Sequence, residues 1–243
     1  MKKIVYSLFA LAIIISACTK TPEPIRFSIL GDSFSAFKGY VQPDSNDVYH
    51  YEDIGVTGPE QMWWSLVADS TGWILERNNS FSGSLVCNYD YVGYYGQYSF
   101  INRMDDLGHP DVIFIFGATN DAYAHSDGNP NDPVVSLGEY IYDDWTSENL
   151  CDFRPGLSFL FHHLKKRYPK ARLYFLLDMN LGSGGVTEQR RTEFIESIHQ
   201  IAFDYRVDLI DLWDIRKSQW HPNAKGQADI AKQVLEYINF EPN

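Results

Sequence analysis

The stretch VIFIF at residues 112–116 is an apolar run of strand length, and LYFLL at residues 173–177 is a second. Nearly unbroken apolar runs of this kind are typical of strands that helices cover on both faces. Further strand-like runs lie at residues 26–30, 73–78 and 207–212. We therefore expect a parallel sheet that contains these five runs.

Stretches with a helical period separate the runs. Residues 61–68 and 157–168 show this period, as do the stretches that follow Thr187 and Pro222. The alternation of strands and helices predicts βαβ units and an α/β sandwich. The last two predicted helices each gather apolar residues on one face: Phe194, Ile195, Ile198, Ile201, Ala202 and Tyr205 on the first, and Ile230, Ala231, Val234, Leu235 and Ile238 on the second.

The composition is that of a globular protein with an acidic surface. Of the 243 residues, 44% are apolar and 15% aromatic, which is ample for the core of one domain over residues 25–243. The formal net charge of −12 repels phosphate backbones, so we expect no nucleic-acid partner. Residues 39–59 and 122–149 are rich in Asp, Asn, Gly, Pro and Tyr and are expected to be long loops, where substrate contacts usually lie.

The N-terminus has the layout of a secretory signal. Two lysines precede an apolar stretch at residues 4–15, which is too short for a good transmembrane span. The segment ISAC at residues 15–18 resembles the bacterial lipoprotein processing box. That resemblance implies a signal peptide over residues 1–18, a lipid on Cys18 and a tether at residues 19–24, although a plain signal peptide is an alternative. We expect a protein of the bacterial cell envelope that meets the membrane only through this anchor.

Four short motifs lie where predicted strands end. Gly-Asp-Ser at residues 31–33 follows the first run, Gly83 follows the second, residues 117–121 end the third, and His221 lies between the fifth run and the last helix. The carboxyl ends of parallel strands meet at one edge of the sheet, so these residues can converge on one crevice. Each motif alone also fits a turn or a helix cap, but the ordered set favours a shared site.

These motifs resemble the blocks of the SGNH (GDSL-type) serine hydrolases. The resemblance spans nearly the whole chain after the signal, and it implies a flavodoxin-like three-layer sandwich, hydrolysis of esters or thioesters, and no cofactor. The matching blocks are Gly31-Asp32-Ser33-Phe34, Asn79-Ser80-Phe81-Ser82-Gly83, Gly117-Ala118-Thr119-Asn120-Asp121 and His221-Pro222-Asn223-Ala224-Lys225-Gly226.

The chemistry of these residues agrees with the resemblance. A serine hydroxyl needs a neighbouring base, and His221 has the side chain whose ordinary pKa lies near neutrality, so we expect Ser33 as nucleophile and His221 as base. A tetrahedral intermediate also needs fixed donors for its oxyanion. The backbone N–H groups of Ser33 and Gly83 and the side-chain amide of Asn120 are the candidates.

One position departs from the family pattern. Most members carry an aspartate three residues before the histidine, and here that residue is Ser218. Such a carboxylate fixes the histidine tautomer and stabilises the imidazolium. We rank a backbone carbonyl in the turn at residues 218–219, or the Ser218 hydroxyl, as the first replacement. Asp214 is the nearest upstream carboxylate, and Asp208 and Asp211 are further options. A slower Ser-His dyad and an inactive site are the other possibilities.

Several other residue groups in the sequence resemble parts of binding sites. An aromatic platform for sugar rings and ordinary packing are both open for Trp63, Trp64, Tyr89, Tyr91, Tyr94, Tyr95 and Tyr98. His162-His163, His125-Ser126-Asp127 and the loop at residues 127–132 lack the spacing of a metal site, so we expect none. Pairing of Cys87 with Cys151 is left open.

The leading functional hypothesis is an esterase that removes short acyl groups, such as O-acetyl, from carbohydrate at the cell envelope. Its substrate would be an acylated small molecule or glycan. A lipase or thioesterase with the same fold is one alternative. A glycan-binding lipoprotein that has lost turnover is another, and Ser218 motivates it.

Overall fold

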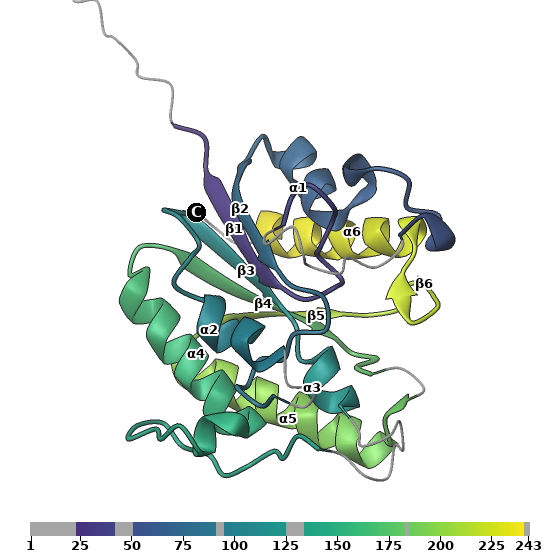
Figure 1. The fold of residues 1–243 in the computed structure, drawn as a ribbon. Helices are drawn as coiled ribbons and strands as arrows, with labels where there is room; N and C mark the ends of the chain where they lie inside the picture. Colours follow the sequence, from purple (N-terminus) through teal and green to yellow (C-terminus); the bar gives the residue numbers. More distant parts are fainter. Residues whose placement is uncertain (1–22, 42–50, 91–94, 125–133, 183–184, 241–243) are drawn as a thin grey trace, which may run out of the picture.

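The structure is a computed structural model that describes residues 23–41, 51–90, 95–124, 134–182 and 185–240. It contains a five-stranded parallel sheet of order β2-β1-β3-β4-β5, which is a flavodoxin-like topology (Figure 1). The expected α/β fold is thus confirmed. The strands are β1 (Arg26–Gly31), β2 (Ile74–Ser80), β3 (Val112–Phe116), β4 (Arg172–Asp178) and β5 (Asp208–Leu212).

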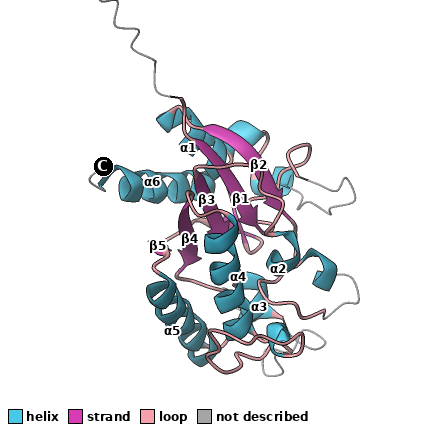
Figure 2. Ribbon diagram, turned by 90° about the vertical axis from the view of Figure 1, so that its left-hand side faces the viewer, coloured by secondary structure: helices cyan, strands magenta, loops and turns pink. Residues whose placement is uncertain are grey.

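Helices cover both faces of the sheet, as Figures 1 and 2 show. One face carries α1 and α6, and the other carries α4 and α5 with the short helices α2 and α3. The bounds are α1 (Trp63–Thr71), α2 (Phe100–Arg103), α3 (Thr119–Tyr123), α4 (Phe153–Arg167), α5 (Glu188–Tyr205) and α6 (Ala224–Phe240).

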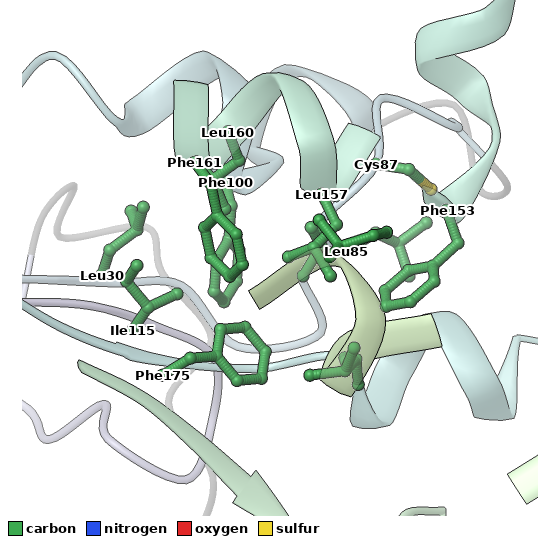
Figure 3. Packing of buried hydrophobic residues seen from close by; sticks show 14 of the residues in the cluster. Leu30, Leu85, Cys87, Phe100, Ile115, Phe153, Leu157, Leu160, Phe161 and Phe175 are labelled. Carbon is green, nitrogen blue, oxygen red and sulfur yellow. The ribbon is translucent and has the colours of Figure 1, made fainter. Parts of the chain in front are cut away.

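The two faces bury separate apolar clusters. On the α4/α5 side, Phe175 of β4 packs with Phe161 of α4, their ring centroids 5.7 Å apart (Figure 3). On the α1/α6 side, Phe114 of β3 meets Trp63 of α1 at 5.6 Å. All five residues of β3 are buried, as its unbroken apolar sequence predicts. Each fully buried ring contributes about 1.5–3 kcal/mol relative to exposure. The two clusters therefore hold the strands, and the turns at their carboxyl ends, firmly in place.

Local signals fix where the helices begin and end. The Thr187 hydroxyl accepts a hydrogen bond from the Arg190 backbone N–H and caps α5. Gly72, with a φ of 71°, ends α1 in the left-handed conformation that glycine adopts readily. The Asn223 side chain accepts the N–H groups of the residues two and three positions further on, at 3.1 and 3.0 Å, and so caps α6.

The helical stretch expected after Pro222 is α6, which begins at Ala224. Pro222 itself lies in β7 (His221–Pro222), which pairs antiparallel with β6 (Lys217–Ser218) in a short hairpin. The segment expected to be a signal peptide, and most of the expected tether, lie outside the described residues. Within the described part of the chain, no helix is long and apolar enough to cross a membrane.

Candidate active site

The end of β1 presents Ser33 on a tight turn. The Asp32 carboxylate accepts the Phe34 backbone N–H at 2.9 Å, and this local bond fixes the turn. A Cβ at Gly31 would lie 2.6 Å from the Ser80 hydroxyl, so glycine leaves room for that side chain beside the turn. Ser33 itself is 8% exposed and lies at the carboxyl edge of the sheet.

His221 reaches Ser33 from the β6–β7 hairpin. Its Nε2 lies 3.0 Å from the Ser33 Oγ, and its Nδ1 lies 3.2 Å from the carbonyl oxygen of Gln219. A carbonyl only accepts, so this contact favours the tautomer with a proton on Nδ1. Nε2 is then left to accept the Ser33 proton. The structure therefore brings together two residues that lie 188 positions apart.

A two-residue turn of positive φ closes this hairpin. Gln219 and Trp220 have φ values of 47° and 73°, the signs that a tight hairpin turn needs. Neither is glycine, and left-handed backbone costs other residues about 1–2 kcal/mol each. Strain of this kind persists where the surroundings hold it, and here it aims the Gln219 carbonyl at His221.

The other candidate orienters of His221 lie in different surroundings. The Ser218 hydroxyl accepts a hydrogen bond from the Asn223 side chain at 3.2 Å. Asp214 is exposed in a left-handed turn after β5, with a φ of 54°. Asp208 pairs with an arginine of β4 at 2.9 Å, and Asp211 pairs with a histidine of α5 at 3.2 Å. Of the groups that the sequence suggested, the turn carbonyl is the one seen against Nδ1.

A buried ion pair stands beside His221. The Lys217 ammonium binds the Asp178 carboxylate at the end of β4, where the two side chains are 11% and 2% exposed. It also lies 5.4 Å from the centre of the Phe34 ring, whose edge packs on the imidazole. The pKa of His221 is lowered, chiefly because burial disfavours the charged ring, and the Lys217 cation acts in the same direction. The imidazole is therefore neutral and able to accept a proton near pH 7.

The glycine block and the asparagine block follow β2 and β3, the two strands that flank β1. Gly83 has a φ of 77° in the turn after β2 and Ala118 a φ of 75° after β3. The Asn120 amide donates to the Ser84 carbonyl at 3.0 Å and lies 3.4 Å from the Asp32 carboxylate. The second contact is long for an N–H···O bond, so that N–H is only weakly engaged.

Two buried carboxylates lie beneath these turns. Burial is the main reason that the pKa of Asp32 rises to about 7 and that of Asp121 to about 6. Asp121 accepts the backbone N–H groups of Val86 and Cys87 at 2.9–3.1 Å, which ties the chain after the glycine block to α3. Asp121, which follows Asn120 in the chain, thus has a structural role.

Of the two interpretations left open for the aromatic residues, a sugar platform and ordinary packing, the structure shows packing for the two tryptophans. Trp63 and Trp64 are 0% and 3% exposed, and their indole N–H groups bond to Ser35, so that part of the hypothesis is wrong. Tyr98 stacks on Phe81 with ring centroids 3.9 Å apart. Tyr89 is half-buried, Tyr91 and Tyr94 lie outside the described residues, and so does the side chain of Tyr95. Trp220, beside His221, is 59% exposed and was not anticipated.

The remaining sequence candidates have other surroundings. His163 bonds to Asp105 at 2.8 Å, and His162 packs on Trp145. His125 and the loop at residues 127–132 lie outside the described residues. In the described ranges, no three His, Cys, Asp or Glu side chains form a metal-binding group. Cys87 is buried, Cys151 is partly exposed, and both are free thiols.

Sequence reasoning anticipated a carbonyl of the turn at residues 218–219, and the hairpin identifies it as that of Gln219. It missed residues that act through distant contacts. The Lys217–Asp178 pair joins two strands far apart in the chain. An arginine at the end of α2, Arg103, bonds beneath both the nucleophile and the glycine blocks.

Comparisons with known proteins agree with this geometry. The sequence profile of the GDSL-like lipase/acylhydrolase family matches residues 25–238. A protein from Bacteroides ovatus described as a GDSL-like lipase is 41% identical, covers 90% of this chain and 100% of its own, and superposes with a TM-score of 0.77. One from Bacteroides uniformis is 35% identical over 90% of this chain and 97% of its own, with a TM-score of 0.76.

More distant chains share the fold alone. A carbohydrate acetylesterase from Sinorhizobium meliloti is 13% identical, with coverages of 88% and 98% and a TM-score of 0.57. Among curated proteins, none matches the chain. The profile match and the two Bacteroides structures establish the assignment: this chain is a carboxylic ester hydrolase that belongs to the GDSL-like lipase/acylhydrolase family.

Proposed function

We propose that the protein hydrolyses acyl esters through a Ser33–His221 dyad. The observation that carries this proposal is the 3.0 Å contact between the Ser33 Oγ and the His221 Nε2. Ser33 attacks the ester carbonyl carbon while its proton passes to Nε2. The tetrahedral intermediate collapses, the bond to the alcohol oxygen breaks, and His221 returns the proton to that oxygen. Water then attacks the acyl-serine by the same proton transfers in reverse, and it releases the acid.

The Gln219 carbonyl takes the orienting position in this mechanism. It holds the Nδ1 proton at 3.2 Å, so the ring stays in the tautomer whose Nε2 faces Ser33. A carbonyl dipole stabilises the imidazolium less than a full negative charge does, since charge-assisted hydrogen bonds are stronger. We therefore expect a working dyad whose rate lies below that of a complete triad.

We propose that the oxyanion binds between the nucleophile turn and the glycine turn. Its donors are the backbone N–H groups of Ser33 and Gly83 and the Asn120 amide. The contact of that amide with Asp32 is long, 3.4 Å, which leaves one N–H weakly engaged and available to a negative charge that develops beside it. Losing one such donor typically costs about 10²–10³-fold in rate.

For the substrate we propose a short acyl group on a carbohydrate. Trp220 supports this because an indole that is 59% exposed, next to the base, offers a flat apolar face of the kind that suits sugar rings. Tyr123 is 47% exposed in α3, three residues after Asn120, and offers a second ring near the same edge. Carbohydrate esterases also occur among chains with this fold.

Two sets of substrates test this proposal. We expect p-nitrophenyl acetate to be cleaved faster than the butyrate and octanoate esters, and acetate to be released from acetylated oligosaccharides. Trp220→Ala should raise KM for the oligosaccharide several-fold and leave p-nitrophenyl acetate unchanged. Phe203→Ala is the matched control, since Phe203 is 79% exposed in the last turn of α5 at the opposite edge of the sheet.

The outcomes separate the alternatives. A preference for octanoate would identify a lipase or thioesterase instead. Tight binding of the oligosaccharide with no turnover by the folded protein would identify a glycan-binding lipoprotein. An unchanged KM in Trp220→Ala would remove the aromatic argument for carbohydrate.

We also propose that a lipid on Cys18 anchors the protein in the bacterial cell envelope. The support is the sequence alone: a short apolar segment that ends in the lipoprotein-like ISAC motif. In a bacterial host, the wild type should sediment with membranes and Cys18→Ala should not. Equal membrane fractions of the two would contradict the anchor.

A further inference from the structure

The Arg103 guanidinium lies buried beneath the site, and the residue is 8% exposed. Its Nη2 donates to the Gly31 carbonyl at 3.1 Å and to the Ser84 hydroxyl at 3.0 Å. Its Nη1 donates to the Asn79 carbonyl and lies 3.3 Å from the side-chain oxygen of the same residue. The Nε donates to the Tyr98 carbonyl at 2.6 Å. One planar fork thus bonds to the ends of two neighbouring strands.

A buried cation of this kind is costly, and its acceptors do not neutralise it. Among the described residues, the groups that accept its hydrogen bonds are three carbonyls, a side-chain amide oxygen and a hydroxyl. Burial lowers the pKa of Arg103 to about 9, and the nearby Asp32 charge opposes that shift. The group is therefore still cationic at neutral pH. An apolar side chain would avoid this desolvation cost, but it would leave three carbonyls without these donors, so the cation serves the turns to which it bonds.

The acceptors are placed around the proposed oxyanion donors. Gly31 lies two residues before Ser33, and Asn79 and Ser84 stand on either side of Gly83 in the chain. Ser84 also accepts the Asn120 amide through its carbonyl. All three proposed donors are thus connected to segments that Arg103 holds, directly or through one further bond.

We propose that Arg103 is a positioning residue for ester hydrolysis: its guanidinium fixes the spacing between the nucleophile turn and the glycine turn, and it holds a positive charge beneath the oxyanion. This inference rests on the proposed function, since the oxyanion belongs to that mechanism. Five donors in a rigid plane can set two loops at once, whereas a lysine ammonium is a compact point charge. The arginine should therefore stabilise the transition state more than the bound substrate.

The test compares Arg103→Lys and Arg103→Gln with the wild type on p-nitrophenyl acetate. We expect kcat to fall about tenfold in the lysine variant and about 10²-fold in the glutamine variant, with KM nearly unchanged. The affinity for a trifluoromethyl ketone, which forms a tetrahedral oxyanion on the serine, should fall in parallel. Arg154→Gln is the matched control, because that guanidinium bonds instead to the Ser197 hydroxyl and the Gly138 carbonyl, both at 2.9 Å.

A milder variant covers the case in which the arginine variants do not fold. Ser84→Ala removes one acceptor of the fork, and we expect it to lower kcat about threefold to tenfold, the scale of one hydrogen bond to a charged group. Wild-type kcat and ketone affinity in Ser84→Ala and in every arginine variant that folds would overturn the inference. Ser33→Ala separates the two proposals: if it keeps full hydrolysis, the proposed function fails, whereas Ser33-dependent hydrolysis that ignores Arg103 removes only this inference.

Discussion

Ser218→Asp tests how the protein works without the usual aspartate. Ser218 pairs with His221 across the hairpin, and directly opposite residues have Cβ atoms about 4.5–5.5 Å apart on the same face. A carboxylate at position 218 therefore lies beside the imidazole. At present burial and the Lys217 cation hold the pKa of His221 below its ordinary value. The new negative charge opposes both effects.

The size of the effect follows from the separation. An opposite charge within about 4–6 Å raises a histidine pKa by about 1–3 units, and each unit is about 1.36 kcal/mol of preference for the imidazolium. The Lys217 ammonium competes for the new carboxylate, so we expect the lower end, about one unit. Because the imidazolium also forms in the transition state, kcat at the alkaline plateau should rise up to about tenfold.

The assay is the pH dependence of kcat/KM for p-nitrophenyl acetate between about pH 5 and 9, where free-enzyme groups set the limbs. The acid limb should move to higher pH in Ser218→Asp and stay in place in Ser218→Asn, which has the same shape without charge. A wild-type profile in the aspartate variant, with no gain in kcat, would refute the reasoning. It would show that the Gln219 carbonyl leaves no room for a second orienter.

Two further substitutions probe charges beside the site. Lys217→Met should also move the acid limb to higher pH, because it removes a cation that lowers the pKa of His221. It should lower Tm by several degrees, since it leaves the buried Asp178 carboxylate without its partner. A lower Tm with an unmoved acid limb would show that Lys217 does not affect the pKa of His221. Asp32 has a pKa raised from 3.8 to about 7 in the folded protein, so its contribution to stability falls as the pH rises through that window. The Tm of Asp32→Asn relative to the wild type should therefore improve from pH 5 to pH 8, and a constant difference would contradict the raised pKa.

The fold follows from the sequence because its strands are covered on both faces. VIFIF at residues 112–116 and LYFLL at residues 173–177 could satisfy their apolar side chains only in the middle of a sandwich, and both are buried in the structure. Short elements could not be predicted, because a pattern needs several residues to appear. β6 and β7 have two residues each, too few to show a period of two.

Some parts of the site could be predicted from residue types, and others could not. Ser33, Gly83, Asn120 and His221 could be identified because side-chain chemistry or glycine freedom marks them in the sequence. A carbonyl of the turn at residues 218–219 was expected against His221, but any residue carries a backbone oxygen, so only the structure singles out that of Gln219. The tryptophans at residues 63 and 64 misled for the opposite reason: an indole suits a sugar platform and a core equally well, and tertiary packing decides.

Covalent labelling with a fluorophosphonate tests the central claim, that His221 activates Ser33, most directly. A serine reacts with this reagent only when a base raises its nucleophilicity. We expect the wild type to take up one phosphonyl group on the peptide that contains Ser33, Ser33→Ala to take up none, and His221→Ala to react far more slowly at neutral pH. An unlabelled wild type, or a His221→Ala protein that labels at the wild-type rate, would contradict the dyad.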